Sequence, residues 1–142
     1  MATNWGDALI ITLRGVVAGV SGLPATQLWQ NTSATPAIDA PNIGDRFVAF
    51  DSYPRECGPT AWDRTTATYR VDVRQPVGVD AFDAMSLAAA IANAFKAACA
   101  TGGLLVQSLY PVELLASRIG PSMQEASWLT VPVSLTLTFD HP

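Results

Sequence analysis

The residues with chemically reactive side chains are few and widely spaced in this chain. It has one histidine, His141, and two cysteines, Cys57 and Cys99. A zinc site needs three or four ligands, and a catalytic nucleophile needs a base beside it. We expect the imidazole of His141, next to the last residue of the sequence, to be solvated and a poor general base. We expect both thiols to be free.

A pair of carboxylates, Asp80 and Asp83, is the closest pair with a spacing suited to acid–base chemistry. General acid–base catalysis needs only two such groups. The same spacing is typical of the first turn of a helix, where a carboxylate caps backbone N–H groups and matches the helix dipole. We find no phosphate-binding glycine loop and no nucleophile elbow in the sequence. We therefore expect no enzyme activity, no metal site and no cofactor.

The composition predicts one folded domain that spans residues 1–142. Hydrophobic residues make up 49% of the chain and charged residues only 14%. A chain of this length can bury a substantial core, and a surface short of charge favours association with other proteins. The net charge of −4, without a basic run, argues against binding to nucleic acid. No apolar stretch is long enough to cross a membrane.

Apolar periodicity predicts two helices. The first extends from about Asn4, which can cap it, to Val20, and the second begins at Asp80 and ends before Gly102. The apolar faces of these helices comprise Leu9, Leu13, Val16, Val17 and Val20 in the first, and Ala84, Ala88, Ile91, Phe95 and Cys99 in the second. These small and aliphatic side chains suit close packing on a sheet.

Alternating or buried apolar runs predict about four to six strands. The segments are Gln27–Gln30, Arg46–Ser52, Thr66–Arg74, Leu104–Tyr110, Val112–Ile119 and Trp128–Phe139. Long connections are expected at Tyr53–Arg64 and Gly120–Ser127. The predicted fold class is α+β, a mainly antiparallel sheet with both helices packed on one face.

The last strand has the strongest pattern, with six apolar residues alternating from Leu129 to Phe139. Pro132 interrupts it, and proline cannot donate a hydrogen bond to a neighbouring strand. We therefore expect this strand to lie at an edge of the sheet or to contain a bulge. An exposed edge needs a cover, and a neighbouring subunit is one such cover.

The expected Tyr53–Arg64 connection is rich in the residue types found at binding hot spots. The alternative is an ordinary hairpin loop whose tryptophan packs back on the sheet, and the same ambiguity applies to Trp128. The candidates for a protein interface are Tyr53, Arg55, Trp62, Arg64, Trp128 and Pro132.

Four segments carry a resemblance to a known family. They are GLPATQLWQN, RFVAF, the cassette TATYRVDVRQPVGVDAFDAMSLAAAIANAF and the final WLTVPVSLTLTF. With them the chain resembles the tail terminator, or tail completion, proteins of long-tailed bacteriophages and phage-derived particles. The cassette and the final strand are the specific parts, and the first half matches mainly in layout.

The resemblance implies a structural virion protein of the tail or neck, assembled in the host cytoplasm. Such proteins form a ring, typically a homo-hexamer, that caps the head-proximal end of the tail tube and ends tube polymerisation. Their partners are the tail tube protein and the head-completion or head-closure protein, and DNA passes through the lumen without specific binding. Alternatives are another neck or tail component, such as a head-closure or tail-tube-like protein, or a small ligand-binding or enzymatic α+β domain.

Overall fold

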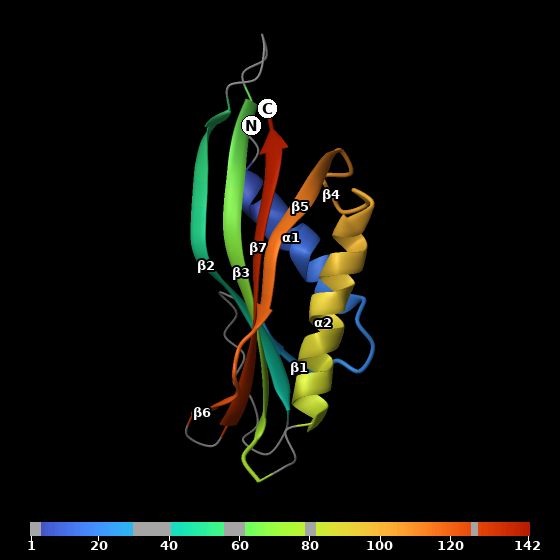
Figure 1. Ribbon diagram of the computed structural model, residues 1–142, viewed down its shortest axis with the longest axis vertical. Coiled ribbons are helices and arrows are strands. Elements are labelled where there is room, and N and C mark those ends of the chain that lie inside the picture. The colour runs from blue at the N-terminus through green and yellow to red at the C-terminus, as the bar shows by residue number, and fades with distance from the viewer. Residues whose placement is uncertain (1–3, 30–40, 56–61, 79–81, 126–127) are drawn as a thin grey trace.

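The computed structural model describes residues 4–29, 41–55, 62–78, 82–125 and 128–142. In chain order, the helices and strands are α1 (Trp5–Ala18), β1 (Thr26–Leu28), β2 (Asn42–Arg55), β3 (Trp62–Pro76), α2 (Phe82–Ala100), β4 (Leu105–Val106), β5 (Tyr110–Ile119), β6 (Met123–Glu125) and β7 (Trp128–His141). The long strands run along the long axis of the molecule, and α2 lies alongside them (Figure 1). The fold is α+β, as predicted.

Within the described residues, one sheet of seven strands has the order β1-β2-β3-β7-β5-β4, and β6 pairs with β7. Only β1 and β2 run parallel, and every other pairing is antiparallel. The predicted range of four to six strands was too small. The extra strand, β6, has three residues inside the expected loop Gly120–Ser127, and so short a segment carries no periodic signal.

The hairpin of β2 and β3 is longer than the sequence indicated. Pairing continues to Arg55 and Trp62, so the prediction of a long connection at Tyr53–Arg64 was wrong. Pro54 and a bulge at Val48 interrupt the alternating pattern of β2, while the ladder with β3 continues on either side of them. The remaining connecting segment, 56–61, which contains Cys57, lies outside the described residues.

Strand β7 lies inside the sheet and not at its edge, which corrects the prediction from Pro132. It pairs with β3 along its whole length, and on the other side with β6 and then β5. Gly120 donates its N–H to the carbonyl of Pro132 at 2.9 Å, so the nitrogen of Pro132 faces the same side. Along β7, the pairing with β6 stops at Thr130 and the pairing with β5 starts at Val133. The missing donor of Pro132 therefore falls at a break between two partner strands.

Both helices contribute to one core with the sheet. Helix α1 begins as predicted, because the side chain of Asn4 accepts a hydrogen bond from the N–H of Asp7 at 3.2 Å. In α2 the predicted apolar positions Ala84, Ala88, Ile91 and Phe95 are buried, and Cys99 is free and partly buried. The predicted cap at Asp80 lies outside the described residues.

Ring contacts of the two helices go to the same set of alternating sheet residues. Trp5 of α1 stacks at 4.6 Å on His141, and Phe95 of α2 lies 6.1 Å from Tyr69. Tyr69 pairs directly with Leu135, so odd-numbered residues of β3 and β7 share one face. We call this the helix face, and the other the open face.

Candidate assembly surfaces

Four of the six predicted interface residues occupy paired positions at one end of the β2–β3 hairpin. Tyr53 is directly opposite Arg64, and Trp62 is the first residue of β3. The side chain of Tyr53 is 44% exposed. Arg55 ends β2 two residues further on, and its side chain lies outside the described part of the chain. This end of the hairpin therefore exposes the aromatic ring of Tyr53.

The guanidinium of Arg64 is bound within the chain. Its Nε donates to Oδ1 of Asp140 at 2.8 Å, and a terminal nitrogen donates to Oδ2 at 3.1 Å. These hydrogen bonds raise the pKa of Arg64 above its ordinary value. The side chain of Arg64 is 31% exposed. Arg64 thus holds the end of β7 against β3 and leaves only part of its surface for a partner.

Trp62 packs against the sheet, which is the alternative that the sequence left open. Its ring lies 5.7 Å from that of Tyr110, edge to face, and Tyr110 lies 5.2 Å from Trp5. Such pairs add to the stability gained from apolar burial. An interface role for the remaining exposed part of Trp62 stays a prediction.

Trp128 and Pro132 lie away from this hairpin end. Trp128 starts β7 and pairs with Pro76, whereas Asp140 lies near the other end of the same strand. Twelve residues of extended chain separate the two by about 40 Å. Pro132 is buried in the middle of the sheet. The six predicted residues therefore do not form one surface.

His141 is 3% exposed, so the prediction of a solvated imidazole was wrong. Its Nε2 lies 2.7 Å from Oγ1 of Thr65, which lies 2.6 Å from Oγ of Ser52. This chain of hydrogen bonds joins β7, β3 and β2. The ring of Trp5 covers the imidazole, and Thr65 is fully buried. The two hydroxyls and the imidazole therefore link three strands by hydrogen bonds. The sequence does not reveal this link, because it shows only a single histidine far from its partners.

On the open face, three arginines surround the carboxylate of Asp72. The sequence did not indicate this cluster as a candidate site. Arg70 and Arg74 donate to the two carboxylate oxygens at 2.6 and 3.1 Å, and Arg46 lies 3.8 Å away. The side chain of Asp72 is only 5% exposed. The signal in the sequence is the alternation of Arg70, Asp72 and Arg74, which places all three on one face. Arg46 joins them only through pairing of β2 with β3.

The helix face holds a second buried carboxylate, Asp45. It accepts hydrogen bonds from Arg14 at 2.8 and 3.2 Å and from the hydroxyl of Tyr69 at 2.5 Å. Burial, and then the charge of Asp45, raise the pKa of Tyr69 above its ordinary value. The hydrogen bond to Asp45 likewise raises the pKa of Arg14. This network fixes α1 to β2 and β3.

Two long sheet edges have no partner along most of their length in the described part of the structure. β1 covers only the first three residues of β2, and β4 covers only the first two of β5. Each edge strand has one bulge with an exposed aliphatic side chain, Val48 at 60% and Leu115 at 53%. An open edge presents backbone N–H and C=O groups that can pair with another strand. These edges are the structural candidates for assembly.

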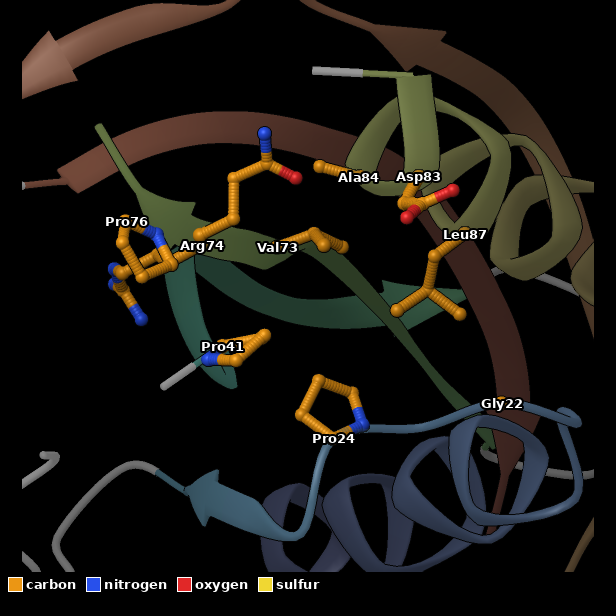
Figure 2. Close-up of a pocket in the computed structure, with 10 residues that line it drawn as sticks. Gly22, Pro24, Pro41, Val73, Arg74, Pro76, Asp83, Ala84 and Leu87 are labelled. Carbon is orange, nitrogen blue, oxygen red and sulfur yellow. The ribbon is translucent and has the colours of Figure 1, made fainter. Parts of the chain in front are cut away.

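A hollow of about 260 Å³ lies between the start of α2, the end of β3 and the segments that precede β1 and β2. Figure 2 shows Pro24 and Pro41 on one side of it and Leu87 and Asp83 of α2 on another. Its lining is mainly apolar, which suits contact with an apolar side chain more than acid–base chemistry.

The described residues contain no group of three or more histidine, cysteine, aspartate or glutamate side chains placed to hold a metal ion. Among the same residues, neither helix has the length and apolar character needed to traverse a bilayer.

Comparison with known proteins gives a family match. A family profile described as phage tail terminator protein matches residues 7–136. No curated protein matches the chain. Among solved structures 27 chains match. One of them is 21% identical with a TM-score of 0.54, and the match covers 94% of each chain. At that identity the likeness supports the fold alone.

Proposed function

Because the chain belongs to the phage tail terminator protein family, we propose that it forms a ring on the head-proximal end of a phage tail tube and ends the tube's growth. Family membership confirms the resemblance read from the sequence. It makes the chain a structural protein of a phage tail, located in the virion tail. The ring, its contacts and its site of assembly in the host cytoplasm are our proposal.

The family match over residues 7–136 is the observation that carries this function. The two open sheet edges support it, because a subunit with two different unpaired edges can contact a neighbour on each side. Hydrogen bonds and ion pairs between strands, such as that of Arg64 with Asp140, also suit a structural role. We propose the tail tube protein and a head-completion protein as the partners on the two sides of the ring, with six subunits as the expected number.

The net charge of −4 per chain suits a lumen through which DNA passes without being held. Repetition of an acidic chain around a ring repels phosphates on average. Specific binding of DNA is therefore not part of the proposal.

Electron microscopy of the purified chain in negative stain tests the ring. We expect closed rings with a central hole, alone or after addition of tail tube protein. A second measurement adds gold-labelled chain to growing tail tubes. Label at one end of each tube, together with shorter tubes, supports termination. Chain that stays monomeric in both experiments, or label along the whole tube, contradicts it.

A further inference from the structure

The two open edges belong to strands that run in opposite directions. β2 is antiparallel to β3, β3 to β7, and β7 to β5. A second copy rotated about an axis along the strands would therefore place its β5 antiparallel to β2 of the first copy. Such a contact continues the sheet from one copy to the next and leaves both edges paired.

On β2, the residues whose backbone groups face the open edge can be identified. Pro54 lacks an N–H, and proline is tolerated in a strand where its nitrogen faces away from the ladder. The neighbours two and four positions earlier, Ser52 and Phe50, face the same way. The short distance of 2.6 Å between the hydroxyls of Ser52 and Thr65 agrees, because side chains approach more closely in a pair that is not hydrogen-bonded through its backbone.

On β5, the outward residues follow from a backbone hydrogen bond. Gly120 donates its N–H to the carbonyl of Pro132 in β7, so the N–H of Ile119 and of Ser117 point to the open edge. The bulge at Leu115 changes which residues of β5 point outward. Before the bulge, it is the even-numbered Val112 that donates its N–H outward, to the carbonyl of Leu104. Antiparallel pairing requires outward residues to meet outward residues, so only even offsets between β2 and β5 are allowed.

Charge decides between the even offsets. A row is the set of residues that lie opposite one another across β2, β3, β7 and β5. Without an offset, each row of one copy continues into the same row of the next. Arg118 of one copy then meets Arg46 of the next, and Glu113 meets Asp51. Like charges directly opposite one another destabilise a sheet. An offset of two residues toward Arg55 places Arg118 and Glu113 opposite neutral residues and gains nothing.

An offset of four residues toward the end of β2 places opposite charges together. Arg118 then lies opposite Asp51, and Glu113 lies opposite Arg55. Glu113 and Arg118 are five residues apart in β5, whereas their partners Arg55 and Asp51 are only four residues apart in β2. The bulge at Leu115 removes this difference, because it adds one residue to β5 without adding a row.

We propose that β2 of one copy pairs with β5 of the next in this register, with Asp51 opposite Arg118 and Arg55 opposite Glu113. The same register brings Phe50 and Ile119, 48% and 43% exposed, opposite each other. Both lie on the helix face, since their partners are Ala67 and Val133. The inference rests on the proposed ring and names the surfaces that close it.

Disulfide crosslinking tests the register. The proposal places Tyr53 directly opposite Ala116 of the next copy, and neither residue faces the new ladder with its N–H. Such narrow pairs bring Cβ atoms close enough for a disulfide. We expect mixed Tyr53→Cys and Ala116→Cys chains, made in a Cys57→Ser, Cys99→Ala background, to give a band at twice the chain mass of 15.0 kDa after mild oxidation.

The matched control combines Ala49→Cys with the same Ala116→Cys. Ala49 occupies the row of Ala116 within one sheet, so this pair crosslinks when there is no offset. Each cysteine variant alone reports pairing of like edges. A band from the Ala49 pair or from a single variant, with none from the Tyr53 pair, overturns the register while rings in negative stain leave the proposed function intact.

A charge exchange tests the same contact without cysteines. We expect Arg118→Asp to lower assembly at least tenfold at low salt and the double variant Asp51→Arg, Arg118→Asp to restore most of it. Circular dichroism checks that each variant is folded. Assembly that is equal in all three proteins, or a double variant that assembles no better than Arg118→Asp, overturns the proposed pairing.

Discussion

The helix face and the open face of the sheet are built from the same strands but are stabilised differently. On the helix face, odd-numbered residues of β3 and β7 are buried with α1 and α2 in an apolar core. The open face carries threonines and charged residues, and Arg46, Arg70 and Arg74 surround Asp72. Among the described residues, each face holds one buried carboxylate, so charge alone does not distinguish the two faces.

The two carboxylates differ in what surrounds their partners. Asp45 binds Arg14, whose side chain is 28% exposed, and also a tyrosine hydroxyl that is itself buried, whereas all the arginines around Asp72 have side chains 20–53% exposed. A buried polar group that loses its partner cannot form a replacement hydrogen bond with water, whereas an exposed group can. We therefore expect the helix face to contribute most of the free energy of unfolding, and the open face to tolerate substitutions as an exposed surface does.

The largest expected effect comes from a charge placed on the helix face. Leu135 is fully buried in β7. We expect Leu135→Asp to prevent folding, because a carboxylate would enter the core without a partner. Circular dichroism and proteolysis measure this. The control, Ser134→Asp, changes the adjacent residue, which lies opposite Arg70 and Arg118. If both variants fold equally well, the assignment of the two faces is wrong.

Removal of each buried carboxylate tests the comparison directly. We expect Asp45→Ala to lower the free energy of unfolding by about 3 kcal/mol, because Arg14 and Tyr69 lose a buried partner. For Asp72→Ala we expect about 1 kcal/mol, because the arginines can be solvated. Urea denaturation of both variants gives the two values. A larger loss for Asp72→Ala reverses the ranking of the faces.

The hydroxyl of Tyr69 makes the helix face sensitive to high pH. Its pKa is raised in the folded protein, first by burial and then by Asp45. The stabilisation is therefore complete below the unfolded pKa of about 10 and declines above it by about 1.4 kcal/mol per pH unit. We expect Tyr69→Phe to cost about 1–2 kcal/mol near pH 8 and little near pH 11. A cost that is constant with pH contradicts this assignment.

The smallest effect is expected on the open face, at Thr66. Its hydroxyl lies 3.1 Å from that of Thr138, which also donates to the carbonyl of Thr65. We expect Thr66→Val to change the free energy of unfolding by less than about 0.5 kcal/mol, because Thr138 keeps its backbone partner. Urea denaturation beside the wild-type chain measures the change. A loss above about 2 kcal/mol shows that this face stabilises the fold more than proposed.

The sequence predicted the elements whose patterns are local. The alternation from Val131 to Phe139 correctly placed five buried side chains on one face of β7, and the spacing from Leu9 to Val17 correctly identified the buried side of α1. These patterns depend only on the repeat of a strand or a helix. The candidate interface was harder to predict, because Tyr53 and Trp62 proved to be strand residues.

By itself, the sequence determined the α+β class, the apolar faces and, through the cassette and the last strand, the family. The tertiary structure alone decided that β7 is central, that His141 is buried, and that β2 and β5 form the open edges. The physical reason is that strand order and burial depend on partners distant in the sequence. A residue such as Pro132 shows which hydrogen bond it lacks, but only its neighbours in space show which strand would have received it.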